Sequence, residues 1–145
     1  MSKRKRIKNS LPFDGKGGVL VVPLRLLKSD PYQLLTPEAK VLLLMMQIHW
    51  RPDDPVAYGV REAMAKIPCA KGTAQRAFDQ LQTSGFIELM DESLFSSRTQ
   101  SKARTWRLTS LPYRGKAPTH EWEKIEATGS KMHLVDNSQG QNCTH

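Results

Sequence analysis

The feature that most constrains this chain is a pair of short amphipathic segments separated by three residues. Residues 60–67 (VREAMAKI) and 71–84 (KGTAQRAFDQLQTS) both carry apolar residues at helical spacing. Pro68-Cys69-Ala70 interrupts the pattern between them, because proline does not continue a helix. Gly85, directly after the second segment, is a typical residue for ending a helix. The sequence therefore predicts two helices joined by a tight connection.

Two predicted strands follow this helix pair. Residues 86–89 (FIEL) are the first, and residues 103–108 (ARTWRL) are the second. Alternation puts Ala103, Thr105 and Arg107 on one face of the second strand and Arg104, Trp106 and Leu108 on the other. The intervening residues 91–101 are polar and have the composition of a loop. We therefore expect a β-hairpin with a long polar tip.

A third, more apolar helix is predicted before this pair. Thr36 is a good N-cap, Pro37 suits the first helical position, and Glu38 complements the helix dipole. The run that follows, AKVLLLMMQIHW, is apolar over most of its circumference, so we expect it to be buried on several sides. Residues 51–55 (RPDDP) end this helix.

The flanking regions carry weaker signals. Residues 19–22 (VLVV) resemble a short buried strand, and a helical turn over residues 24–27 is expected to break at Pro31. Near the other end, Thr119 is a candidate cap for a short helix anchored by Trp122. The predicted organisation is a basic disordered arm, a folded domain, an extension with a short helix and a flexible tail, over residues 1–16, 17–109, 110–127 and 128–145.

The charge of the chain points to a polyanionic partner. The formal net charge is +8, and the first ten residues carry five positive charges and no negative one. Like charges repel, so the arm is expected to be disordered and to bind phosphates by counterion release, although a solubilising tail is an alternative. The arm residues that we assign to this phosphate contact are Lys3, Arg4, Lys5 and Arg6.

The stretch AMAKIPCAKGTAQRAFDQLQTSGFIEL, residues 63–89, resembles the winged-helix heads of GntR- and MarR-type bacterial regulators. The positions that match their usual pattern are Thr73, Ala74, Ala77, Phe78, Leu81 and the run Gly85-Phe86-Ile87. The sequence departs from the pattern where Pro68 replaces the turn glycine and Ala70 replaces the serine N-cap. The resemblance implies an α+β, mostly α fold: a winged helix-turn-helix with a three-helix head and a β-hairpin wing, here with a short N-terminal strand and flexible tails.

In such a fold the second helix of the pair enters the major groove and the hairpin reaches the backbone or the minor groove. Lys71, Gly72 and Thr73, at the N-terminus of residues 71–84, are then candidates for phosphate contact. Gln75 and Arg76 are candidates for base edges, because their side chains pair bidentately with adenine and guanine. Further candidates are Arg61 for the backbone and Arg98, Lys102 and Arg104 in the wing, residues 90–103. The alternative for each is an ordinary solvated surface.

The function expected from these observations is sequence-specific binding of double-stranded DNA, as a transcriptional regulator of a bacterium or mobile element. Alternatives are a replication-initiation or partition protein of a plasmid or phage, and a winged-helix protein-interaction module. Regulators of this kind usually act as homodimers, for which Trp50 and Trp122 are candidate contacts.

The sequence has no catalytic, metal-binding or phosphate-loop motif. We therefore expect no enzymatic activity, no cofactor, no metal and no small-molecule effector. No apolar run approaches the ~20 residues that span a bilayer. The expected location is the cytoplasm, in association with the nucleoid.

Overall fold

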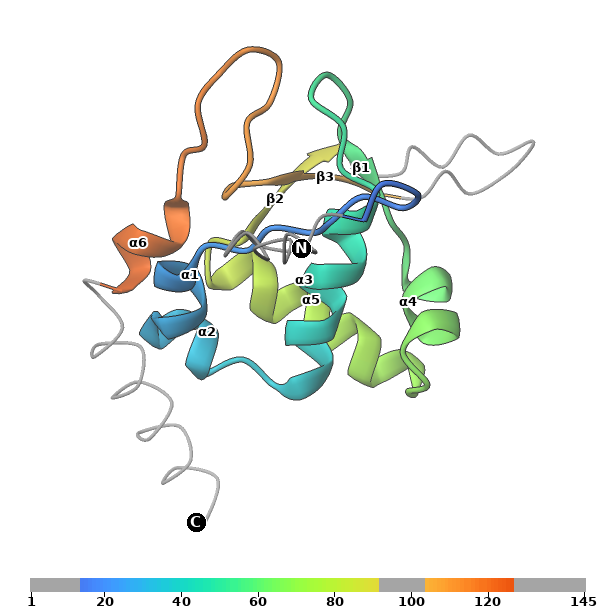
Figure 1. Cartoon of the computed structure of the whole chain (residues 1–145). Helices are drawn as coiled ribbons and strands as arrows, with labels where there is room; N and C mark the ends of the chain where they lie inside the picture. Colours follow the sequence, from blue (N-terminus) through green and yellow to red (C-terminus); the bar gives the residue numbers. More distant parts are fainter. Residues whose placement is uncertain (1–13, 92–103, 127–145) are drawn as a thin grey trace, which may run out of the picture.

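A computed structural model describes residues 14–91 and 104–126 of the 145-residue chain (Figure 1). In these ranges the protein is an α+β fold with six helices and one three-stranded antiparallel sheet, and this confirms the predicted class. In chain order the elements are α1 (Leu24–Lys28), α2 (Asp30–Gln33), α3 (Pro37–Ile48), β1 (Val56–Ala57), α4 (Val60–Lys66), α5 (Lys71–Thr83), β2 (Ile87–Asp91), β3 (Thr105–Leu108) and α6 (Glu121–Glu126).

Helix α3 begins where its sequence signals predicted. The hydroxyl oxygen of Thr36 accepts a hydrogen bond from the backbone N–H of Ala39 at 3.4 Å, and Pro37 is the first helical residue. Its buried residues are Ala39, Leu42, Leu43 and Met46, whereas Ile48 is 60% exposed. The expectation of burial on several sides was therefore wrong. The physical reason is that α3 packs mainly on one neighbour, α5, and no other helix in the described ranges covers its opposite side.

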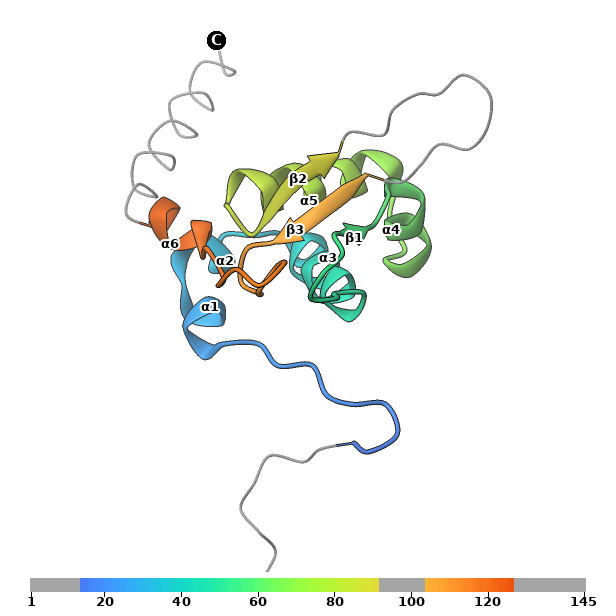
Figure 2. The same cartoon turned by 90° about the horizontal axis from the view of Figure 1, so that it is seen from above.

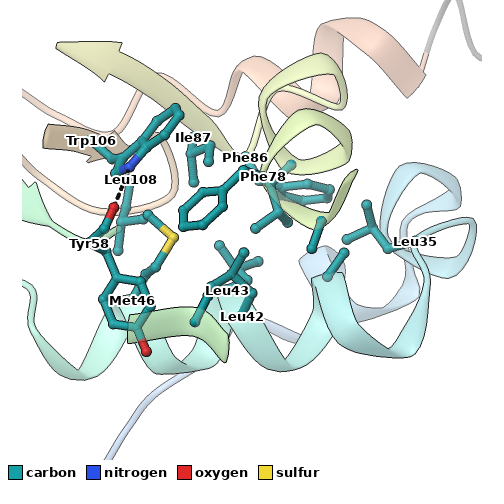
Figure 3. Packing of buried hydrophobic residues seen from close by; sticks show 14 of the residues in the cluster. Leu35, Leu42, Leu43, Met46, Tyr58, Phe78, Phe86, Ile87, Trp106 and Leu108 are labelled. Carbon is teal, nitrogen blue, oxygen red and sulfur yellow. Dashed lines mark hydrogen bonds between the residues drawn. The ribbon is translucent and has the colours of Figure 1, made fainter. Parts of the chain in front are cut away.

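The core lies between the sheet and helices α3 and α5 (Figure 3). The rings of Phe78 on α5 and Trp106 on β3 stack with their centroids 5.3 Å apart. The indole N–H of Trp106 donates to the backbone oxygen of Tyr58 at 3.0 Å, which satisfies its one polar group inside the core. Trp106 therefore joins the sheet to α5 and to the segment that leads into α4.

The sheet has the strand order β1-β3-β2, with β3 in the centre. Trp106 lies opposite Val56 of β1 on one side and Leu89 of β2 on the other. Trp106 and Leu108 are buried, as the alternation in ARTWRL predicted. Strand β1 was missed, because two residues are too few to form an alternating pattern in the sequence.

The N-terminal part of the fold differs from the prediction in two places. Residues 19–22 are not a strand, and Val21 is 67% exposed. No strand of the described chain pairs with this segment. The helical break lies at Ser29 rather than at Pro31, because Ser29 caps α2 by accepting from the N–H of Tyr32 at 3.4 Å. Pro31 then lies in the first turn of α2, where its missing N–H removes no helical hydrogen bond.

Helix α6 closes the other end of the core. It begins at Glu121, so the residue before it is His120, with φ 48°, and Thr119 does not occupy the cap position. Trp122 is buried and stacks on Phe86 with a centroid separation of 6.1 Å. Gly85 has φ +77°, and a Cβ there would lie 2.8 Å from the backbone nitrogen of Trp122. Residues 110–126 thus pack into the same core as the preceding elements.

Candidate nucleic-acid interface

Helix α5 has one buried face and one exposed face. Ala74, Ala77, Phe78 and Leu81 are buried, as their helical spacing predicted. Lys71, Gly72, Gln75, Arg76 and Asp79 are exposed, and Thr73 is half-buried. The guanidinium of Arg76 donates to the Thr73 hydroxyl at 3.5 Å, one turn towards the helix N-terminus. The helix therefore presents a polar face that carries donors and acceptors for an external partner.

The N-terminus of α5 has no side-chain cap. Ala70 occupies the N-cap position with extended backbone angles (φ −69°, ψ 156°), and no side chain of the described residues accepts a hydrogen bond from the first turn. The first turn also has no acidic residue, and its first residue is Lys71. Because the positive end of the helix dipole and a lysine coincide there, the positive potential of this terminus is not neutralised locally.

Helix α4, which precedes this terminus in the chain, adds two cations. Arg61 lies in its first turn and Lys66 in its last, and both are exposed. Only residues 67–70 separate Lys66 from Lys71. From residue 60 to residue 83, four cationic side chains stand against two carboxylates, Glu62 and Asp79. Lys66 was missed in the sequence, although its position just before the predicted break is a signal that could have identified it.

Arg104 lies at the base of the predicted wing. Its side chain is exposed, and its backbone oxygen accepts a hydrogen bond from the N–H of Tyr58 at 3.1 Å. This bond fixes Arg104 next to the short connection between β1 and α4, whose first helical residues include Arg61. The other wing candidates, Arg98 and Lys102, lie outside the described residues, as do Lys3, Arg4, Lys5 and Arg6 of the arm.

Figure 2 shows how these elements are arranged from above. Helix α4 and the N-terminal end of α5 lie at the side of the molecule away from α1 and α6, whereas the C-terminal end of α5 lies towards α6. The end of β2 and the start of β3 lie on the same side as α4. The fold therefore brings α4, the N-terminus of α5 and Arg104 to one end, and this end is the candidate interface.

The two tryptophans considered for dimer contacts do not offer free rings. Trp122 is 1% exposed and belongs to the core of its own chain, so its assignment to a dimer surface was wrong. Trp50 is half-buried and donates its indole N–H to the backbone oxygen of Pro112 at 3.1 Å. Both residues stabilise contacts within one chain.

No three His, Cys, Asp or Glu side chains in residues 14–91 and 104–126 are grouped so that they could hold a metal ion. None of the helices in these ranges has the length and apolar character needed to cross a membrane.

Comparison with known proteins gives no match. No protein-family model fits the chain, and neither the curated proteins nor the solved structures contain a significant relative.

Proposed function

We propose that the protein is a sequence-specific double-stranded DNA-binding protein with a winged helix-turn-helix head. The order of elements supports this assignment: a helix, a short strand, two helices joined by a short connection, and a hairpin whose second strand lies between the other two. In the proposed complex α5 enters the major groove, α4 lies across the backbone, and residues 92–103 reach the backbone or the minor groove.

The observation that carries the proposal is the exposed face of α5 together with its uncapped, lysine-bearing N-terminus. Phosphate oxygens would accept hydrogen bonds from the free N–H groups of the first turn, and Lys71 would add charge attraction. Gln75 and Arg76, one turn further along, would then lie towards base edges in the groove. Arg61, Lys66 and Arg104 would contact phosphates on either side.

The proposed role is transcriptional regulation in the cytoplasm, on the nucleoid. A replication or partition role uses the same head on several clustered sites, so the number and spacing of sites distinguish the two roles. A protein-interaction module would not require four cationic side chains around the α4–α5 connection.

The test is selection of bound fragments from a random duplex library at about 0.15 M salt, where non-specific electrostatic binding is weakened. We expect one enriched motif. Absence of enrichment, with binding that disappears as salt rises, would overturn the assignment of Gln75 and Arg76 as base readers.

Matched variants locate the interface. Lys71→Ala should weaken binding several-fold for all sequences, because it removes a phosphate contact. Lys28→Ala is the control, since Lys28 is equally exposed but ends α1, on the other side of the molecule (Figure 1). Arg76→Ala should instead relax the preference at one base by about 1–3 kcal/mol. Equal effects of Lys71→Ala and Lys28→Ala would place the DNA elsewhere.

The arm is tested separately. Deleting residues 1–8 should weaken binding to every sequence and flatten its dependence on salt, because it removes five of the positive charges. A change in the preferred sequence would show that the arm reads the minor groove instead.

A further inference from the structure

The segment Val19–Val22 has the sequence of a strand but no strand beside it. It runs as an extended connection between Gly18 and Pro23 along the outside of α3 (Figures 1 and 2). Val19 is 49% exposed, Leu20 44% and Val21 67%, whereas Val22 packs against the core. Three consecutive large apolar side chains are thus exposed to solvent, and only the fourth, Val22, packs against the core.

The backbone of the segment is also incompletely paired. In the described chain its hydrogen bond is the one from the side-chain amide of Gln47 to the backbone oxygen of Val21, at 2.8 Å. In an extended chain the backbone N–H and C=O groups of successive residues point to opposite edges, so residues i and i+2 share an edge. The edge formed by Val19 and Val21 therefore faces α3, and the edge formed by Leu20 and Val22 faces away from it. Within residues 14–91 and 104–126, the N–H and C=O groups of Leu20 and Val22 make no hydrogen bond.

We propose that two copies of the chain associate by antiparallel pairing of this outer edge. Leu20 of one copy would exchange two backbone hydrogen bonds with Val22 of the other, and the two-fold axis would repeat this pair, which gives four bonds. Val21 would then lie directly opposite Val21 of the other copy, as a non-hydrogen-bonded pair. The proposal does not depend on DNA binding.

The sequence of the segment favours a second copy of the chain as the partner of this edge. Residues 17–24 carry no charge, so a two-fold axis at Val21 brings no like charges together along the paired strands. The free edge offers two donors and two acceptors in alternation, and an identical edge turned by two-fold symmetry matches them one to one. Residues 17–24 offer no charged side chain that could pair with a charged partner.

The area of the contact sets its strength. Val19, Leu20, Val21 and Leu24, together with Ile48 next to Gln47 on α3, are 44–68% exposed. Complete burial of these side chains in both copies would remove at most about 1,000 Å², which is the lower limit for a specific interface. We therefore expect a weak dimer that forms at micromolar concentrations and is extended by other contacts when two heads bind neighbouring sites.

Engineered disulfides test the register. In a background with Cys69→Ala and Cys143→Ala, Val21→Cys should form a disulfide-linked dimer under mild oxidation, because paired Cα atoms about 4.5 Å apart are within disulfide range. Val19→Cys is the matched control. In this register Val19 lies opposite Pro23, so the two Val19 residues are about 13 Å apart and cannot form a disulfide. Equal yields from the two variants, or no dimer from Val21→Cys, would overturn the register.

Sedimentation equilibrium tests the association without cysteine chemistry. The wild-type mass should rise from 16.4 kDa towards twice that value as concentration increases to about 100 µM. Val21→Lys should remain monomeric with the same unfolding midpoint, because this exposed side chain makes little contact within its own chain. A wild-type protein that stays monomeric, or a Val21→Lys variant that dimerises equally well, would contradict the proposal. Neither measurement involves DNA, so its failure leaves the proposed function intact.

Discussion

The two longest helices, α3 and α5, pack against each other but begin in opposite ways. Helix α3 starts with Thr36, which caps it, then Pro37 and Glu38, and each of these residues stabilises a helix N-terminus. Helix α5 starts with Ala70, Lys71 and Gly72, and each of these is unfavourable at the same position. Both helices bury only apolar side chains, so their buried faces do not account for this difference between their termini.

The N-terminus of α5 is less stabilised than the N-terminus of α3. Thr36 is also tied to its neighbour, since its N–H and its hydroxyl both donate to the side-chain oxygen of Gln80 on α5 at 3.1 Å. The N-terminus of α5 has no such partner in the described chain, and its free donors face solvent. A terminus that stays uncapped and basic is suited to an anionic partner, which supports the proposed contact with phosphate.

The buried faces should respond alike to truncation. Leu42 on α3 and Leu81 on α5 are both fully buried, so Leu42→Ala and Leu81→Ala should each lower the free energy of unfolding by about 2–5 kcal/mol. Urea unfolding followed by circular dichroism measures both. A cost below about 1 kcal/mol for either variant would mean that its side of the α3–α5 contact is not part of the cooperative core.

The termini should respond in opposite directions. Thr36→Ala should lower the free energy of unfolding by about 1–2 kcal/mol, because it removes the α3 cap and one contact with Gln80. Ala70→Ser should raise it by about 0.5–1 kcal/mol, because a hydroxyl can then cap α5. Thermal unfolding compares both variants with the wild type. If Ala70→Ser gave no gain, the contrast between the two termini would not be energetic.

Gly72 sharpens the comparison further. It lies in the first turn of α5, and a Cβ built there meets no atom within 4 Å, so the fold does not require a glycine. Gly72→Ala should therefore stabilise the protein by up to about 1 kcal/mol. It should also weaken DNA binding, because the added methyl group would lie on the surface that approaches the DNA phosphates. Unchanged binding would place Gly72 outside the contact, while Lys71→Ala would still test the interface itself.

The smallest expected effect concerns Tyr58, which contacts both helices through His49 and Phe78. Burial raises the pKa of its hydroxyl above the ordinary value, and the nearby Glu62 carboxylate raises it further. The phenol of the unfolded chain therefore ionises first, from about pH 10, and stability should fall as the pH rises from there towards the higher pKa of the folded state. Tyr58→Phe should flatten this loss in urea unfolding at pH 8 and pH 11. Parallel losses in both proteins would show that other groups control the alkaline transition.

The helices of the head could be predicted because their signals are local. The cap at Thr36, the break at Pro68 and the end at Gly85 depend on the backbone preferences of single residues and their near neighbours. The faces of α5 followed from spacing alone, and so did the exposure of Gln75 and Arg76. Lys66 was not identified, because its only signal is its position just before the break at Pro68.

The errors arose where a distant part of the chain decides the outcome. VLVV has strand-forming residues, but a strand needs a neighbour, and the described chain provides none for it. Val56 and Ala57 have no strand pattern, yet they pair because β3 presents an open edge to them. The burial of Trp122 likewise depends on Phe86 and Gly85, which lie more than thirty residues away in the sequence.

The sequence by itself determined where α3, α4 and α5 begin and end, which face of α5 is buried, and that the chain is basic. These properties depend on the backbone preferences and spacing of residues within one or two helical turns, which do not require distant contacts. Only the tertiary structure decided that β3 lies between β1 and β2, that α6 closes the core against Gly85, and that Arg104 is held beside the start of α4. These arrangements come from contacts between residues far apart in the chain, and their energy exists only when both partners are in place.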